Sequence, residues 1–220
     1  YPNIWRERSD SDIKDEEQRG IPFSVRLKTP QNGETTFKDH VYGDISVKNS
    51  EIDDFILARS DENQTPVYNL VVVVDDHSMA ITHVIRGEDH ISNTIKQILI
   101  YKALNWKIPE FVHLPMILAP NKERLSKRHG ATGVQEYQRQ GYQYEGLLNY
   151  LAFLGWNPGT DEEIMNLDTL AKSFSFEGIQ KKGAIFDIKK LNWFSSKHLL
   201  IQSSDSIIEN IIKIDKEWAL

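Results

Sequence analysis

Three segments in a fixed order constrain the fold of this chain more than any other feature. A continuous, largely β-branched run, residues 70–74, precedes helix-forming sequence from about Asn93 to Leu104, which Ser92 can cap, and a second apolar run, residues 111–118. A short run that is apolar throughout is typical of a strand buried on both faces of a sheet. A strand, a helix and a strand in this order form a right-handed parallel crossover, so we predict an α/β fold. Nucleotide sites in such sheets lie at the carboxyl ends of the strands.

A short basic loop lies at that predicted edge of the sheet. Residues 124–130 read Arg-Leu-Ser-Lys-Arg-His-Gly and follow the run that ends at Leu118. Cations on such a loop neutralise a polyphosphate, and the hydroxyl and backbone N–H groups fit its oxygens. A loop of this kind taken alone is more often a solvated basic turn. Its position after a predicted strand favours a phosphate site.

The N-terminal part has the pattern of a small α+β region. Residues 6–19 are polar and mixed in charge, which indicates a solvated helix or loop. The Asn32-Gly33 pair is a turn signal that favours a hairpin. The segments with strand-like sequences are 23–28, 35–41 and 44–47.

The C-terminal part, from Thr132 onward, is helical in pattern. Apolar residues recur at helical spacing between Tyr144 and Leu154, and Gly155 ends the segment. A short helix is predicted over 167–174, and Asp187 is a suitable N-cap for another. The predicted apolar positions are Leu147, Leu148, Leu151, Ala152 and Leu154 in the first helix, with Leu191, Phe194 and His198 on one side of the last.

Composition excludes several classes of protein. A chain of 220 residues has one to two domains, and the absence of cysteine excludes disulfides and thiolate metal sites. The apolar runs are too short to span a membrane. A net charge of −6 argues against diffuse nucleic-acid binding but allows a local basic track. No spacing of histidines indicates a metal site, and Asp75-Asp76 is interpreted as a pair of turn acids at a strand end rather than a metal site.

Four motifs together resemble one enzyme family. Residues 68–76 (Tyr-Asn-Leu-Val-Val-Val-Val-Asp-Asp), 84–90 (Val-Ile-Arg-Gly-Glu-Asp-His), 113–118 (His-Leu-Pro-Met-Ile-Leu) and the basic loop occur in the order and near the spacing of the glutamyl-tRNA synthetase family. In that family, within the class I aminoacyl-tRNA synthetases, the loop is the K-M-S-K-S-like second signature. The first signature, H-I-G-H, is absent, and the chain starts at Tyr1. We therefore expect an internal piece of a longer enzyme that is inactive in isolation.

The resemblance implies a domain organisation. Residues 67–160 would be the second half of a Rossmann-like catalytic domain. Residues 1–66 would be an incomplete connective insertion of the acceptor-end-binding type, and residues 161–220 an incomplete helical stem-contact domain.

The resemblance also implies a function. The expected activity is ATP-dependent formation of glutamyl-adenylate and transfer of the glutamyl group to the 3′ end of tRNA(Glu). ATP would enter with Mg²⁺, and no zinc is expected. The expected protein is a cytoplasmic monomer with no membrane partner. The alternatives are a glutamyl transferase that modifies a tRNA base and a non-catalytic nucleotide- or RNA-binding module.

The residues implied for the nucleotide lie on the basic loop and before it. Lys127 would stabilise the pyrophosphate leaving group together with Ser126, and Arg124 and Arg128 would complete the cradle. A plain surface loop is the alternative for the two arginines. The resemblance adds Asp89 on the ribose and the backbone of Ile117 on adenine. An acid favoured by a helix dipole is the alternative for Asp89.

The residues implied for glutamate are Tyr68, Arg86 and His90. A guanidinium reads a carboxylate through two parallel hydrogen bonds, so Arg86 would recognise the free γ-carboxylate that distinguishes glutamate from glutamine. A structural salt bridge to Glu88 or Asp89 is the alternative. Tyr68 could equally be an ordinary amphipathic aromatic residue with a satisfied hydroxyl.

Overall fold

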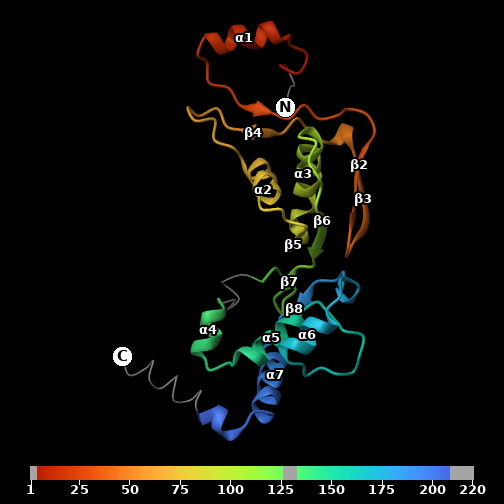
Figure 1. The fold of residues 1–220 in the computed structure, drawn as a ribbon, viewed down its shortest axis with the longest axis vertical. Helices are drawn as coiled ribbons and strands as arrows, with labels where there is room; N and C mark the ends of the chain where they lie inside the picture. The colour runs from red at the N-terminus through yellow and green to blue at the C-terminus, as the bar shows by residue number, and fades with distance from the viewer. Residues whose placement is uncertain (1–3, 126–132, 209–220) are drawn as a thin grey trace, which may run out of the picture. The chain divides into compact units, whose positions relative to one another are not determined.

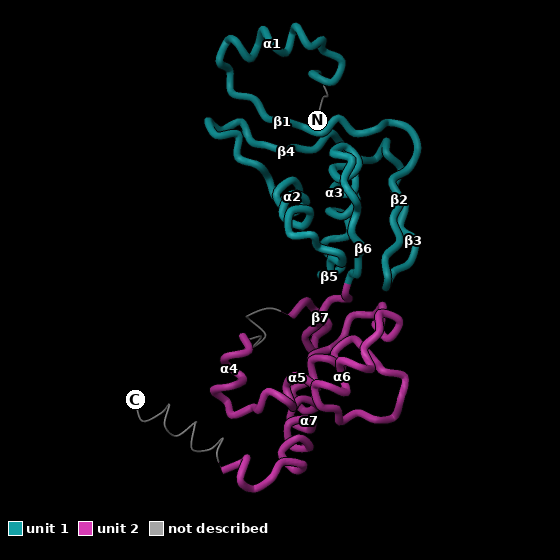
Figure 2. The backbone as a smooth tube through the Cα atoms, in the orientation of Figure 1, with its two compact units in different colours: residues 1–113 teal, residues 114–220 magenta. Residues whose placement is uncertain are grey.

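The computed structural model describes residues 4–125 and 133–208, and the chain forms two compact units (Figure 2). Unit 1 comprises residues 1–113 and unit 2 residues 114–220. None of the helices in the described ranges is both long enough and apolar enough to cross a membrane.

Unit 1 is built on a four-stranded sheet with the order β3-β2-β6-β5 (Figure 1). Strands β2 (Glu34–Asp39) and β3 (Gly43–Lys48) form an antiparallel hairpin. Strand β2 pairs in parallel with β6 (Glu110–Leu114) at Asp39 and Phe111, and β5 (His83–Gly87) is the other neighbour of β6. The segment predicted as an insertion therefore shares a sheet with the segment predicted as catalytic.

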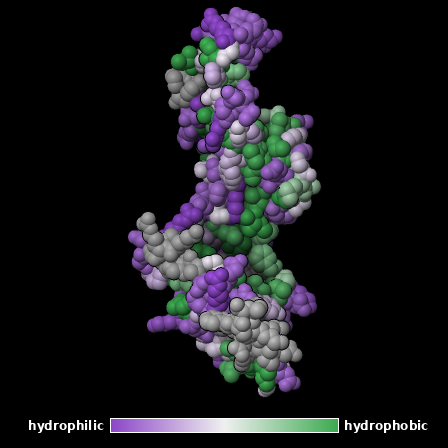
Figure 3. All heavy atoms as spheres, turned by 90° about the vertical axis from the view of Figure 1, so that its left-hand side faces the viewer, coloured by the Kyte–Doolittle hydropathy of each residue, from purple (hydrophilic) through white to green (hydrophobic). Residues whose placement is uncertain are grey.

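Two helices supply most of the core of unit 1. Helix α2 (Tyr68–Ser78) packs against α3 (Ile91–Ala103), which follows the short 3-10 helix η2 (Glu88–His90). The buried apolar residues of this cluster are Ile52, Phe55, Val73, Ile95, Leu99, Ile100 and Tyr101. The face of unit 1 on the side of α2 also carries exposed apolar side chains (Figure 3).

The N-terminal part of unit 1 consists of shorter elements. Helix α1 (Asp10–Gln18) begins with a capping box between Ser9 and Asp12 and has no buried residue, as the prediction of a solvated helix or loop required. Strands β1 (Val25–Arg26) and β4 (Ile56–Ala58) form a separate antiparallel pair, and a 3-10 turn, η1 (Asn49–Glu51), follows β3.

Unit 2 combines a two-stranded parallel sheet with helices. Strand β7 (Ile117–Leu118) pairs with β8 (Ala184–Ile185). The helices are α4 (Val134–Arg139), α5 (Tyr144–Ala152), α6 (Leu167–Ser173), the 3-10 turn η4 (Phe176–Gly178) and α7 (Ile188–Leu200). The core between α4, α5 and α7 contains Tyr137, Leu147, Tyr150, Leu191 and Phe194.

The prediction of a central strand at residues 70–74 is wrong. The run lies inside α2, where Val73 is fully buried while Val71 and Val74 are each 38% exposed. Burial of one stripe, rather than of two faces, is the signature of a helix, and here packing against α3 overrides the β propensity of valine. Consequently, Tyr68 begins a helix and Asp75-Asp76 lies within it. The strand that precedes α3 is β5.

Other boundaries also needed correction. The turn at Gly33 is present, with a φ of +77°, but it does not join the segments around β1 and β2 into a hairpin, because β1 pairs with β4. The predicted strand 111–118 divides around Pro115, which has no N–H to donate, into β6 and β7 with different partners. Helix α3 begins at Ile91 without a side-chain cap, so Ser92 is not its N-cap.

The helix predictions for unit 2 are confirmed more closely. Asp187 caps α7 by accepting a hydrogen bond from the Lys189 N–H, and Leu191, Phe194 and His198 are buried on one side. In α5, Leu147 is buried as expected, but Leu148 and Leu151 are exposed.

Candidate functional site

The guanidinium of Arg86 is surrounded by neutral hydrogen-bond acceptors. Strand β5 places it half-buried against α3, where Nη2 donates to the hydroxyl of Thr94 and to Oε1 of Gln97 at 2.7 Å. Longer contacts join Nη1 to the Tyr68 hydroxyl (3.5 Å) and Nε to Nε2 of His113 (3.4 Å). Burial lowers the pKa of Arg86, and the nearby Tyr68 and Asp76 oppose that effect. A guanidinium stays protonated even so.

Within the described residues, Arg86 forms no ion pair. The carboxylate of Glu88 instead accepts a hydrogen bond from the Tyr42 hydroxyl. The salt bridge to Glu88 or Asp89 that the sequence left open is therefore not present. Arg86 is therefore a half-buried cation that no carboxylate of the described ranges contacts in an ion pair.

A buried histidine and aspartate lie behind Arg86. The side chains of His113 and Asp39 are both fully buried, with Nδ1 of His113 2.7 Å from Oδ2 of Asp39. A carboxylate only accepts, so Nδ1 carries the proton. Burial lowers the pKa of His113 despite Asp39, which keeps the ring neutral and leaves Nε2 as an acceptor for Thr94 (3.0 Å) and Arg86.

Asp39 is itself held by the backbone. Its Oδ1 accepts the N–H groups of Val41 and Tyr42 at 2.9 Å each, and its Oδ2 also accepts the N–H of His113 at 3.1 Å. The hairpin end thus fixes Asp39, Asp39 fixes the tautomer of His113, and His113 and Thr94 position Arg86.

Two further residues predicted for glutamate lie beside Arg86. The Tyr68 hydroxyl is 3.4 Å from Nδ1 of His90, and the Asn93 amide nitrogen is 3.2 Å from the same atom. Tyr68 is 50% exposed at the start of α2, so its hydroxyl is accessible to a ligand. The structure therefore brings Tyr68, Arg86 and His90 together, and their role in binding glutamate stays a prediction.

The residues predicted for the nucleotide are described only in part. Asp89 lies in η2 of unit 1 and is exposed. Ile117 and Arg124 belong to unit 2, where the Ile117 carbonyl accepts the Leu125 N–H at 2.9 Å. A carbonyl oxygen has two lone pairs, so this bond leaves the Ile117 carbonyl able to accept a second hydrogen bond. Ser126, Lys127 and Arg128 lie outside the described residues.

Residues 3–193 match the family model for "tRNA synthetases class I (E and Q), catalytic domain". The chain belongs to the class I tRNA synthetase family. It is 49% identical over 191 residues to a glutamate–tRNA ligase of Moorella thermoacetica, which covers 87% of this chain and 39% of that protein. It is 45% identical over 214 residues to glutamate–tRNA ligase 2 of Ruegeria pomeroyi, covering 97% and 44%. The chain thus spans about two-fifths of the length of these relatives.

Solved structures agree with the sequence relatives. A glutamate tRNA ligase from Elizabethkingia meningosepticum in complex with its amino acid superposes with a TM-score of 0.85 at 32% identity, covering 96% of this chain and 45% of that one. A glutamate-tRNA synthetase from Elizabethkingia anophelis gives 0.83 at 31% identity, covering 97% and 46%. The predicted resemblance is confirmed, and so is a mixed α/β class I catalytic domain.

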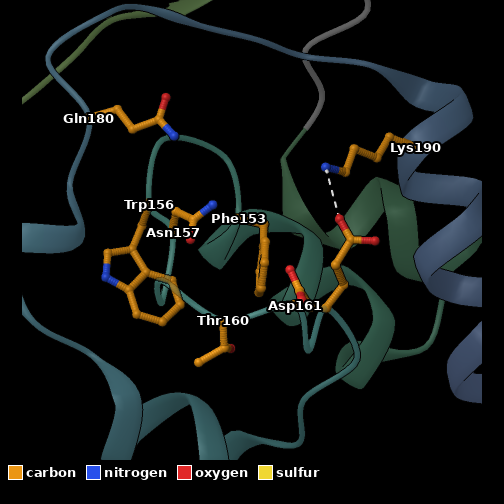
Figure 4. Close-up of a pocket in the computed structure, with 8 residues that line it drawn as sticks. Phe153, Trp156, Asn157, Thr160, Asp161, Gln180 and Lys190 are labelled. Carbon is orange, nitrogen blue, oxygen red and sulfur yellow. Dashed lines mark ion pairs between the residues drawn. The ribbon is translucent and has the colours of Figure 1, made fainter.

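A hollow in unit 2 of this synthetase domain is not the candidate site. It has a volume of about 320 Å³ and lies beside Trp156 and Phe153, with an ion pair between Lys190 and Glu163 at 3.7 Å on one side (Figure 4). Of the residues predicted for glutamate or ATP, none of those that the structure describes lines it.

Sequence reasoning missed four residues that hold Arg86: Asp39, Thr94, Gln97 and His113. Thr94 and Gln97 lie one turn apart on α3, a spacing that places both on the side facing β5. Asp39 and His113 are far apart in the chain and meet only because β2 pairs with β6. No local pattern indicates that pairing.

Proposed function

We propose that this chain is the part of a glutamate–tRNA ligase that recognises glutamate and carries the second signature loop. In the first step the α-carboxylate of glutamate attacks the α-phosphate of ATP, giving glutamyl-adenylate and pyrophosphate. In the second, the hydroxyl of the terminal adenosine of tRNA(Glu) attacks the acyl carbon and AMP leaves. Neither step needs a protein nucleophile, so alignment and charge stabilisation are what the protein supplies.

The observation that carries the proposal is the environment of Arg86. Among the described residues, every hydrogen-bond acceptor of Arg86 is neutral and Asp76 acts on it without a hydrogen bond, so this half-buried cation is incompletely compensated, because burial of a charge is unfavourable without a paired counter-charge. A ligand carboxylate would provide that charge through two parallel hydrogen bonds. The γ-carboxylate of glutamate is our candidate, with Tyr68 and His90 beside it.

The nucleotide half of the proposal rests on the family match and on the loop sequence. Lys127 and Ser126 would act on the departing pyrophosphate, Arg124 and Arg128 would hold the phosphates, and Asp89 and the Ile117 backbone would contact the nucleoside. ATP would enter as its magnesium complex, so the metal is part of the substrate.

The finer organisation is proposed on the same basis. Residues 67–160 would be the second half of the Rossmann-like domain, residues 1–66 would contact the tRNA acceptor end, and residues 161–220 the tRNA stem. The ligase would act as a monomer in the cytoplasm. No observation favours the base-modifying transferase or the non-catalytic module over the ligase.

Replacement of Arg86 tests the proposal, in an enzyme that carries an H-I-G-H half in addition to this chain. Arg86→Ala should weaken glutamate recognition by about 2–5 kcal/mol, because the ligand anion loses its partner. ATP affinity should be nearly unchanged, and discrimination against glutamine should fall. Arg139→Ala removes an exposed arginine that pairs with Glu136 and is the matched control.

Two measurements decide between binding and scaffolding. The first is the pair of separate binding constants for glutamate and ATP, and the second is the melting temperature. Equal weakening of glutamate binding and ATP binding, together with a large fall in melting temperature, would show that Arg86 has a structural role. It would also remove the main support for the proposal.

A further inference from the structure

Three potential metal ligands converge at one edge of the unit 1 sheet. His40 follows β2, His83 begins β5 and Glu110 begins β6. Nε2 of His40 lies 2.6 Å and Nε2 of His83 lies 3.6 Å from Oε2 of Glu110. One ligand atom from each residue lies within 4.8 Å of the others, and all three side chains are exposed.

These distances are close to those of a metal site. Ligand atoms about 2.0–2.2 Å from a tetrahedral ion are roughly 3–3.6 Å apart. The His83–Glu110 separation already falls in that range. Nε2 of His40 donates to Glu110 in the structure, so on metal binding this proton would have to leave Nε2, and the separation of the two atoms would widen by up to about 1 Å.

The second ring nitrogen of His83 also has a neighbour. Nδ1 of His83 lies 3.0 Å from the Thr82 hydroxyl. With Nδ1–H donating to that hydroxyl, Nε2 would be left for a metal, as second-shell partners of ligating histidines commonly arrange.

We propose that His40, His83 and Glu110 bind one divalent transition-metal ion of the zinc class, with water in the fourth position. Two imidazoles and a carboxylate suit Zn²⁺ and its neighbours, whereas Mg²⁺ and Ca²⁺ prefer oxygen ligands. The inference is independent of the proposed ligase function. It departs from the expectation of no zinc, which rested on the absence of cysteine and on spacing along the sequence.

The site would join three strand ends across the sheet. In the structure β2 and β6 pair in register only at Asp39 and Phe111. A metal bound by His40 and Glu110 would clamp that junction, and it would hold the hairpin end that supplies Asp39 to His113. The expected consequence is a more stable unit 1 rather than a new reaction.

Metal titration of the 220-residue chain tests the inference. Calorimetry with ZnCl₂ should show one equivalent bound, and Zn²⁺ should raise the melting temperature, while MgCl₂ should do neither. His40→Ala, His83→Ala and Glu110→Gln should each weaken Zn²⁺ binding by at least about 10–100-fold, the scale seen for loss even of outer-shell partners. His77→Ala, which removes an exposed histidine stacked on Trp106, should leave it unchanged.

The near-isosteric Glu110→Gln variant keeps the test decisive if a histidine variant fails to fold. It loses only the ligand charge, on an exposed side chain. No Zn²⁺ binding by the unaltered chain would overturn the inference. So would binding that survives Glu110→Gln, or binding that His77→Ala weakens equally, because the ion would then sit elsewhere.

Discussion

At the scale of single residues, the site is defined by what lies behind Arg86 rather than by Arg86 alone. Asp39 accepts four donors, and two of them belong to His113. This arrangement decides which nitrogen of the imidazole faces the guanidinium. Family motifs led to the proposal of Tyr68, Arg86 and His90, whereas the residues that position Arg86 come from pairings that only the folded chain creates.

Asp39→Asn should disturb Arg86 without touching any ligand. Replacing Oδ2 by an NH₂ group turns a donor toward the two donors of His113, so stability should fall by about 1–3 kcal/mol. Asp44→Asn, on the exposed face of the same hairpin, should change stability by less than about 0.5 kcal/mol. Urea unfolding of the 220-residue chain measures both, and equal effects would contradict the role given to Asp39.

Lys127 carries the second prediction at this scale, and it rests on the signature motif. In an enzyme with both signatures, Lys127→Ala should slow adenylate formation by about 10²–10³, the usual result of removing one charge-stabilising group. Glutamate binding should change much less. Single-turnover kinetics separate the two, with Lys122→Ala, two residues before the basic loop, as the control. A loss confined to glutamate affinity would be incompatible with a leaving-group role.

At the scale of elements, the sequence predicts best where one periodicity is long and has clear ends. Helix α7 has its cap at Asp187 and its buried stripe where the sequence places them, and β2 and β3 lie close to the predicted strand segments 35–41 and 44–47, whereas segment 23–28 forms only the two-residue β1. The failure at residues 70–74 has a physical cause. Five apolar residues fit a buried strand and a helical stripe equally well, and only packing against α3 decides between them.

A pair of valine substitutions tests that assignment. In helix α2, Val73→Ala removes a fully buried side chain and should destabilise the chain by about 1–3 kcal/mol. Val74→Ala changes a residue that is 38% exposed and gains helix propensity, so it should be neutral or slightly stabilising. A central strand buried on both faces would make both substitutions costly. Chemical denaturation of the two variants therefore distinguishes the two structures.

At the scale of the whole molecule, each unit has one buried histidine among its described residues, and burial lowers the pKa of both. His113 in unit 1 is fully buried, and His198 in unit 2 is 3% exposed, with Nε2 2.8 Å from Oδ1 of Asn149. Burial lowers both pKa values, against the opposing charges of Asp39 on His113 and Glu145 on His198, while Arg86 and His90 lower that of His113 further. The stability of both units is therefore linked to pH in the same direction.

The sign of the linkage follows from proton uptake. Below an ordinary histidine pKa of about 6.5, the unfolded chain binds protons that the folded chain does not bind. The free energy of unfolding should therefore fall as the pH drops from about 6.5 toward the lowered pKa values of the two histidines in the folded chain. Each histidine contributes at most about 1.4 kcal/mol per pH unit. Burial also raises the pKa of Asp76, which lies in unit 1 and therefore leaves the comparison within unit 2 unaffected. Hydrogen exchange with mass spectrometry between pH 7.5 and 5.5 reports the two units separately.

A substitution in one unit makes this prediction specific. His198→Gln keeps an N–H donor for Asn149 but cannot be protonated, so the pH dependence of unit 2 should flatten while that of unit 1 persists. His77→Gln removes an exposed histidine of unit 1 and should leave both slopes unchanged. If acidification instead stabilised unit 2, or if His198→Gln left its slope intact, burial of a neutral His198 would not be the source of the linkage.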